Sequence, residues 1–172
     1  MKQFFKNLYL NNLLFRKLVN WLFDSFEGLP QPTKVDGSFA SSLADGLVSG
    51  ELKPIGECVG SENNVQELFF KKLGFKKENI HIVKGWFQDS LPRTSKEIKE
   101  IALLRLDGDW YESTKVCLEN LYPKVVKGGY VIFDDYGCWE GCRIATDEYF
   151  KKNNIKAGLI RIDATGFYFK KP

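Results

Sequence analysis

Two apolar runs in the middle of the chain each end in aspartates. Residues 101–106 are followed by Asp107 and Asp109, and residues 129–133 are followed by Asp134 and Asp135. If the two runs are adjacent strands, these carboxylates meet at the carboxyl edge of one sheet, where open α/β sheets bind ligands. Like charges placed that close repel one another, and a hard cation such as Mg²⁺ relieves the repulsion. The pattern therefore predicts a Mg²⁺ site; the alternative is that each pair opens a polar, solvated turn.

Four runs have the composition of strands that would position these side chains. They are residues 18–23, 80–84, 101–106 and 129–133. Helical spacing is found at residues 65–73, 95–100, 112–121 and 140–152, and residues 157–162 and 166–169 resemble a closing antiparallel pair. Strands that alternate with helices are typical of an α/β fold with a largely parallel sheet.

Two further strand ends carry residues suited to a nucleotide. Asp24 ends the first strand of this sequence. In nucleotide-binding folds an acid at the end of the second strand accepts hydrogen bonds from ribose hydroxyls, so Asp24 is a candidate ribose ligand. Trp86 and Phe87 follow residues 80–84 and could flank a flat ring such as adenine, with packing in the core as an equal alternative. His81, the one histidine, lies inside a predicted strand and is interpreted as structural.

The N-terminal segment and one long connection have a different character. In residues 1–16, apolar and aromatic side chains recur every three or four positions, which predicts an amphipathic helix. Such a helix could lie on a membrane surface, but packing on its own sheet is favoured. Residues 33–60 are rich in Gly, Ser and Pro, which predicts a long loop or lid with a short helix near residues 39–47.

Length and composition exclude several classes of protein. The 172 residues suit one domain, and a net charge of +3 with dispersed lysines does not indicate a nucleic-acid partner. Four cysteines without CxxC spacing and a single histidine argue against zinc and predict free thiols in a reducing cytoplasm. No apolar run reaches the roughly 20 residues of a membrane-spanning helix.

Five sequence blocks in a fixed order resemble the macrocin O-methyltransferase (TylF-like) family. They are DSFEGLP at 24–30, GWFQDSLP at 85–92, LRLDGDWYEST at 104–114, GGYVIFDDY at 128–136 and RIDATG at 161–166. The resemblance extends from about residue 20 to the C-terminus. It implies a Rossmann-like class I methyltransferase sheet with helices on both faces. It also implies a Mg²⁺-dependent enzyme that uses S-adenosylmethionine to methylate a hydroxyl of a sugar or glycosylated small molecule.

The resemblance also implies roles for individual residues. The implied metal ligands are Asp107, Asp134 and Asp135, with Asp109 as the general base. The implied cofactor contacts are Asp24, Ser25, Gly85, Trp86 and Asp107. These roles agree with the chemistry, because a cation that holds a sugar diol lowers a hydroxyl pKa and leaves a nearby carboxylate to take the proton.

One feature of the family is missing from this sequence. Family members begin with a further strand and a glycine-rich turn, so the domain is predicted to be truncated, with a gap between the strands that end at Asp24 and Asp107. Three explanations are open: a remnant with weak cofactor binding, a strand supplied by a partner subunit, or a sequence that starts late. The competing function is a non-catalytic, oligomerising scaffold. A homo-oligomer is favoured over direct closure of the gap.

Overall fold

In a computed structural model of the chain, the structure describes residues 18–172, so the predicted helix at residues 1–16 lies outside the described part. The strands are β1 (Asn20–Asp24), β2 (Ile80–Lys84), β3 (Ile101–Leu106), β4 (Val125–Phe133), β5 (Ile160–Arg161) and β6 (Phe167–Lys170). The α-helices are α2 (Gly37–Leu43), α3 (Glu62–Gln66), α4 (Phe87–Thr94), α5 (Tyr111–Leu121) and α6 (Glu140–Lys152). Each predicted strand is present, and the alternation of strands and helices confirms the α/β class.

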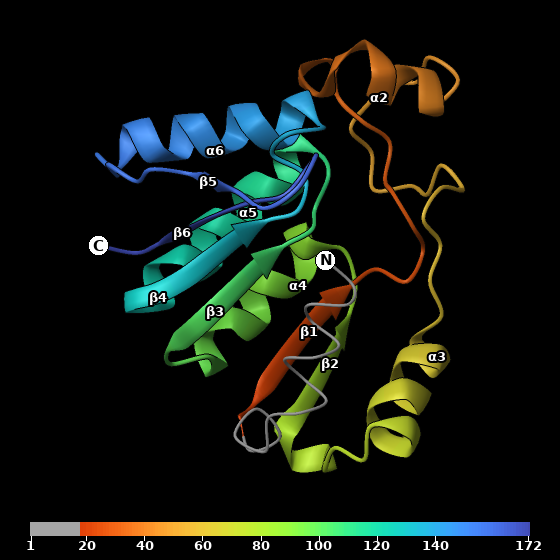
Figure 1. The fold of residues 1–172 in the computed structure, drawn as a ribbon. Helices are drawn as coiled ribbons and strands as arrows, with labels where there is room; N and C mark the ends of the chain where they lie inside the picture. The colour runs from red at the N-terminus through yellow and green to blue at the C-terminus, as the bar shows by residue number, and fades with distance from the viewer. Residues whose placement is uncertain (1–17) are drawn as a thin grey trace.

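The strands form two separate sheets. In Figure 1 the arrows of β1, β2, β3 and β4 point the same way. One contains β1 and β2, paired in parallel, and the other has the order β3-β4-β6-β5, with β6 antiparallel to its neighbours. Within residues 18–172, β1 pairs only with β2 and β3 only with β4. The predicted gap is therefore present, and direct closure between β1 and β3 is not observed.

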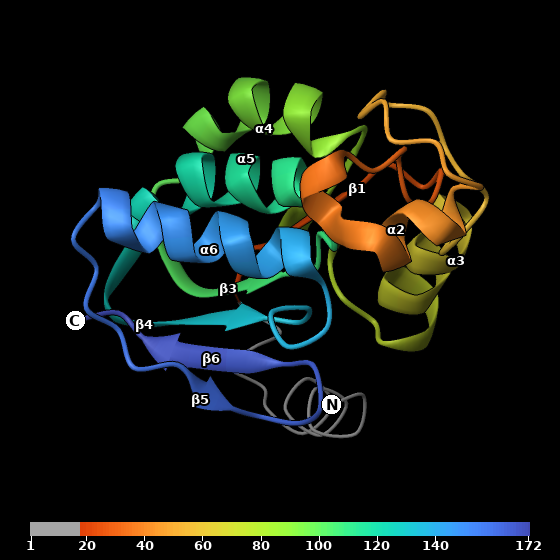
Figure 2. The ribbon, with the colours of Figure 1, turned by 90° about the horizontal axis from the view of Figure 1, so that it is seen from above.

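The main core lies between the larger sheet and the helices that cover it. Helices α4, α5 and α6 lie on one face of this sheet, as Figure 2 shows from above. Leu118 of α5 packs there with Val131 and Phe133 of β4, and all three side chains are fully buried. Trp21 and Phe23 of β1 pack against the same core. Side-chain packing therefore joins the smaller sheet to the larger one, although no strand pairing does.

The alternating burial along β3 follows from its two unlike faces. Leu104 and Leu106 are buried in the core, whereas Arg105 between them points to the other face and is exposed. Strands bury alternate side chains, so Asp107 continues the row of Arg105 at the carboxyl end of the strand. This period of two is what places the acidic turn after β3 outside the core.

The segment between β1 and α3 is more ordered than the predicted loop. It carries a short 3₁₀ turn (Lys34–Asp36) and α2, and it folds back so that the Leu29 N–H donates to the Glu57 carbonyl at 2.9 Å. Leu29 and Ala40 form a small second core with Trp110. The predicted helix at residues 95–100 is only a 3₁₀ turn over Ser95–Glu97. Among residues 18–172, no helix combines the length and apolar character needed to cross a bilayer.

Candidate active site

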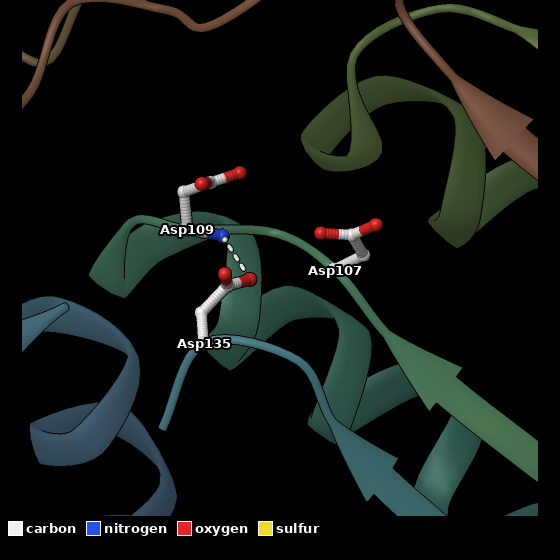
Figure 3. Close-up of side chains that lie close together, drawn as sticks. All are labelled: Asp107, Asp109 and Asp135. Atoms are coloured by element: carbon white, nitrogen blue, oxygen red, sulfur yellow. Dashed lines mark hydrogen bonds between the residues drawn. The ribbon is translucent and has the colours of Figure 1, made fainter. Parts of the chain in front are cut away.

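The acidic residues meet where β3 and β4 end side by side. Leu106 pairs with Phe133, and the Asp134 N–H donates to the Leu106 carbonyl at 2.9 Å, so the two turns leave the sheet together. Carboxylate oxygens of Asp107, Asp109 and Asp135 lie within 4.8 Å of one another, as Figure 3 shows. The predicted convergence of acids from two strand ends is therefore present.

A strained turn directs Asp109 toward this cluster. Its φ of 53° lies in the left-handed region, which side chains other than glycine rarely adopt. The Trp110 N–H donates to the Gly108 carbonyl at 2.5 Å, and the Asp109 N–H donates to Asp135 Oδ2 at 3.3 Å. Strain of this kind persists only when the surrounding structure holds it, and it concentrates at functional sites.

Crowding and burial make two of these carboxyl groups weak acids. Burial away from solvent, as the main cause, and the charge of Asp107, as the second, raise the pKa of Asp109 to about 7. A hydrogen bond from the Trp139 side chain opposes the shift. Loss of solvent and then the charge of Asp109 raise the pKa of Asp135 to about 8. Both groups therefore favour a proton or a cation at neutral pH.

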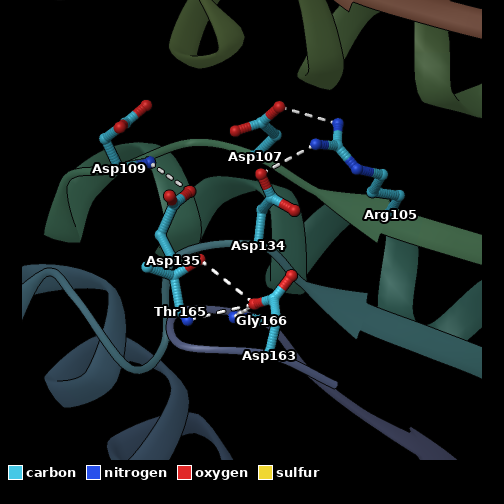
Figure 4. A network of polar contacts seen from close by, with 8 residues as sticks. All are labelled: Arg105, Asp107, Asp109, Asp134, Asp135, Asp163, Thr165 and Gly166. Carbon is cyan, nitrogen blue, oxygen red and sulfur yellow. Dashed lines mark hydrogen bonds and ion pairs between the residues drawn. The ribbon is translucent and has the colours of Figure 1, made fainter. Parts of the chain in front are cut away.

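Asp134 lies beside the cluster and is held by Arg105. The guanidinium contacts Asp107 Oδ2 at 2.7 Å and Asp134 Oδ2 at 2.8 Å, as Figure 4 shows. The other Asp134 oxygen, Oδ1, is buried and has no hydrogen-bond partner among the described residues. Of the predicted metal ligands, Asp107 and Asp135 thus meet in the cluster, whereas Asp134 keeps one oxygen on Arg105 and one uncommitted.

A cavity of about 280 Å³ extends from this cluster toward the ends of β1 and β2. Four of the five predicted cofactor residues line it: Asp24, Ser25, Trp86 and Asp107. Gly85, the fifth, does not line the cavity. Its N–H donates to the Asp24 carbonyl at 2.9 Å and so joins the ends of β1 and β2. Asp109 also lines the cavity. The cavity therefore brings Asp107 and Asp109 together with Asp24, Ser25 and Trp86, whereas Asp134 and Asp135 are not among its lining residues.

Sequence reasoning missed two residues of the cavity wall. Gln88 at the start of α4 lines the cavity, and its Oε1 is buried without a hydrogen-bond partner among the described residues. The available signal was its place in the GWFQDSLP block, two residues after Trp86. Cys58 lines the cavity from the segment between β1 and α3. No spacing signal could place it there, because the folding of that segment depends on long-range contacts.

Comparison with known proteins assigns the family. A family model described as macrocin-O-methyltransferase (TylF) matches residues 4–171. The chain belongs to the TylF family. The TylF relatives include demethyldecarbamoylnovobiocin O-methyltransferase of Streptomyces niveus, which is 38% identical over 151 residues, or 88% of this chain and 54% of the relative.

Another TylF relative is an 8-demethyl-8-(2,3-dimethoxy-alpha-L-rhamnosyl)-tetracenomycin-C 4'-O-methyltransferase of Streptomyces olivaceus. It is 32% identical over 154 residues, which cover 87% of this chain and 54% of the relative. The solved structure of the O-methyltransferase NovP has a TM-score of 0.70 and 37% identity, and the match covers 89% of this chain and 60% of that chain. The fold is thus that of the TylF methyltransferases. The chain spans about half the length of the curated relatives it matches.

Proposed function

We propose that this chain is part of a Mg²⁺-dependent O-methyltransferase that uses S-adenosylmethionine to methylate a sugar hydroxyl on a small molecule. The observation that carries the proposal is the carboxylate cluster of Asp107, Asp109 and Asp135, of which Asp107 and Asp109 line the cavity. Two relatives support the reaction class, because both are named O-methyltransferases, and the name of one specifies a rhamnosyl group.

The donor set fits a magnesium ion. Mg²⁺ prefers oxygen ligands and is usually held by one or two carboxylates together with water or substrate. Asp107 and Asp135 contribute oxygens from the cluster. Asp134, which precedes Asp135 in the chain and has an Oδ1 without a hydrogen-bond partner, would be a further ligand. When bound, the ion would neutralise the crowded carboxylates and orient an acceptor hydroxyl.

The other end of the cavity fits the nucleoside part of S-adenosylmethionine, which supplies an electrophilic methyl group on a sulfonium. Asp24 and Ser25 at the end of β1 are placed to meet ribose hydroxyls, and the Trp86 ring after β2 offers a surface for adenine. The unpartnered Oε1 of Gln88 provides an acceptor for an exocyclic amine. These residues would bind and orient the nucleoside, whereas the acids at the opposite end of the cavity would hold the metal ion and take the proton.

Asp109 is positioned to move the proton. It lies in the same cavity wall as Asp107 and has a pKa of about 7, which suits a general base near neutral pH. In this arrangement Asp109 would take the acceptor hydroxyl proton, while the methyl group would pass from the sulfonium sulfur to the hydroxyl oxygen and leave a neutral thioether. The left-handed turn that carries Asp109 fixes its direction relative to Asp135.

Calorimetric titration of the purified chain with S-adenosylmethionine, with and without Mg²⁺, tests this proposal. We expect saturable binding of the cofactor and a separate heat of binding for Mg²⁺. A chain that binds neither would contradict a methyltransferase function. Lys96→Ala is a suitable control, because Lys96 is exposed and lies outside the cavity wall, so both heats should match those of the unmodified chain.

A second candidate function is an oligomerising scaffold. It is favoured by the unpaired edges of β1 and β3 within residues 18–172, because open strand edges can pair with another chain. In that case light scattering at tens of micromolar would show a dimer or larger assembly, with no heat on addition of S-adenosylmethionine. A monodisperse monomer would reject it.

A further inference from the structure

Asp36 is a buried carboxylate in the segment between β1 and α3, far along the chain from the acidic cluster. Its side chain is only 2% exposed. Oδ2 accepts hydrogen bonds from the Thr33 N–H at 2.6 Å and the Thr33 hydroxyl at 2.8 Å. Oδ1 accepts one from the Tyr111 N–H at 2.6 Å. Both oxygens are thus occupied, and one of them reaches a residue 75 positions away.

This contact caps α5 from outside the helix. The first N–H groups of a helix lack partners within it and are normally satisfied by the preceding side chain. Trp110 holds that capping position and makes no side-chain capping bond. Asp36 supplies the acceptor instead, and its negative charge at the N-terminus of an 11-residue helix is favourable.

The approach of α6 shows how closely this carboxylate is enclosed. A Cβ added to Gly141 in the first turn of α6 would lie 2.0 Å from Asp36 Oδ1 and 2.6 Å from the Tyr111 nitrogen. Such distances are impossible without movement, so the absence of a side chain at residue 141 is required. Asp36 therefore lies at the N-termini of two helices, one of which begins directly after the Asp109 turn and the other after the Asp135 turn.

A second hydrogen bond from the segment between β1 and α3 holds Trp110, the residue between Asp109 and Tyr111. The Trp110 indole N–H donates to the Pro30 carbonyl at 2.8 Å, and both groups are buried. Trp110 and Tyr111 are thus both fixed from the segment between β1 and α3. The adjacent Asp109 therefore has little conformational freedom, because it directly precedes Trp110 and its own φ is already in the left-handed region.

We propose that Asp36 is a positioning residue that holds the turn at residues 107–111, and with it the carboxylates of Asp107 and Asp109, in the geometry the metal and the acceptor require. The importance of that geometry for binding rests on the proposed function. Asp36 does not touch the cavity; it acts through the Tyr111 backbone. The segment that covers the site and the acids that do its chemistry are thereby coupled through one buried side chain.

Hydrogen exchange measured by mass spectrometry tests the positioning role independently of any activity. In Asp36→Ala the Tyr111 N–H and the backbone around it lose their acceptor, so amides in residues 107–114 should exchange about tenfold faster or more. Asp36→Asn keeps the shape and one acceptor oxygen and should give an intermediate increase. Unchanged exchange at residues 107–114 in Asp36→Ala would overturn the inference.

The control is Ser61→Ala, which removes the capping side chain of α3, a helix other than α5 and α6. Ser61 accepts the Asn64 N–H at 3.4 Å at the start of α3, so exchange should rise there and remain unchanged at residues 107–114. If Ser61→Ala accelerated exchange at residues 107–114 as much as Asp36→Ala does, the effect would be general loosening and the inference would fail.

Titration with Mg²⁺ alone separates this inference from the proposed function. We expect the wild-type chain to bind Mg²⁺ and Asp36→Ala to bind it about tenfold more weakly, with Ser61→Ala like wild type. Equal affinity in Asp36→Ala would contradict a role in positioning ligands. A wild-type chain that binds no Mg²⁺ would instead contradict the metal part of the proposed function, and the exchange data would still decide whether Asp36 holds the turn.

Discussion

The two ends of the cavity differ in how fully the protein satisfies its own polar groups. At the β1 end, Asp24 Oδ1 accepts the Phe26 N–H at 2.6 Å, and the Ser25 hydroxyl both accepts the Glu27 N–H and donates to the Gly28 carbonyl. At the β3 and β4 end, Asp109 and Asp135 have raised pKa values because they are buried near like charges.

This difference separates a preformed binding surface from an incomplete one. At the β1 end the Asp24 and Ser25 side chains are engaged in local turns, and the Oε1 of Gln88 is left as an acceptor for a neutral nucleoside. The β3 and β4 end holds more negative charge than the single Arg105 guanidinium in contact with it can balance. Buried charges need partners, so this end requires a cation or protons to be stable. Mutations at the two ends should therefore have different signatures.

The largest expected effect is on turnover and belongs to the acidic end. Asp109→Asn removes the base but keeps the size of the side chain, so methyl transfer to a sugar acceptor should slow by about 10²-fold or more. The affinity for S-adenosylmethionine should change little, because the nucleoside end is untouched. Transfer of radiolabelled methyl groups measures the first quantity and calorimetry the second. Equal turnover in the variant would assign the proton to another group.

The metal response should also depend on the acidic end alone. By binding the folded chain, Mg²⁺ should raise the melting temperature, and Asp134→Asn should abolish that rise. Scanning calorimetry with and without Mg²⁺ is the measurement. Asp45→Asn is the control, because Asp45 is exposed and lies outside the cluster. Its backbone has a positive φ, in the left-handed region, which asparagine tolerates. A rise retained in Asp134→Asn would remove that residue from the ligand set.

These two ends were predictable from the sequence to different degrees. Asp107 directly follows one apolar run, and Asp135 lies two positions after the other. Strand ends in a parallel sheet converge, so predicting their meeting required only a correct identification of two strands. The pairing of Asp134 with Arg105 was not predicted, because it depends on which way each side chain leaves its strand.

The role of Asp36 was less accessible still. It lies in a segment predicted to be a loop or lid with a short helix near residues 39–47, and its partner Tyr111 is 75 residues away. Local patterns predict periodic elements well, but a buried carboxylate that caps a distant helix depends on the packing of the whole segment. The separate β1–β2 sheet was expected from the missing strand, whereas its attachment through Trp21 and Phe23 was not.

A smaller effect should mark the nucleoside end. Trp86→Ala removes an aromatic surface from the cavity wall and should weaken S-adenosylmethionine binding by about three- to tenfold, in line with the usual worth of an aromatic contact. The Mg²⁺ response in melting should be unchanged, because no cluster acid contacts this ring among the interactions described. A loss of the Mg²⁺ response in Trp86→Ala would show that the two ends are not independent.

The last expected effect is a drift of stability with pH, which the acidic end should produce. The folded chain holds protons on Asp109 and Asp135 up to pH of about 7 and about 8, whereas the ordinary pKa of these groups is 3.8. Between pH 4 and 8 the folded state therefore binds more protons than the unfolded state. Linkage then requires the free energy of unfolding to fall as pH rises through this window.

Mg²⁺ should reverse part of that drift, because it stabilises the ionised carboxylates that repel one another in the metal-free chain. The rise in melting temperature caused by Mg²⁺ should accordingly be small near pH 5 and larger near pH 8. Asp135→Asn should flatten the metal-free drift, since it removes a carboxyl group with a raised pKa and lessens the repulsion on Asp109. Melting curves at four pH values with and without Mg²⁺ measure both trends. Stability that rises with pH in the metal-free wild-type chain would mean that the acidic end is balanced by charge already present, and the contrast between the two ends would disappear.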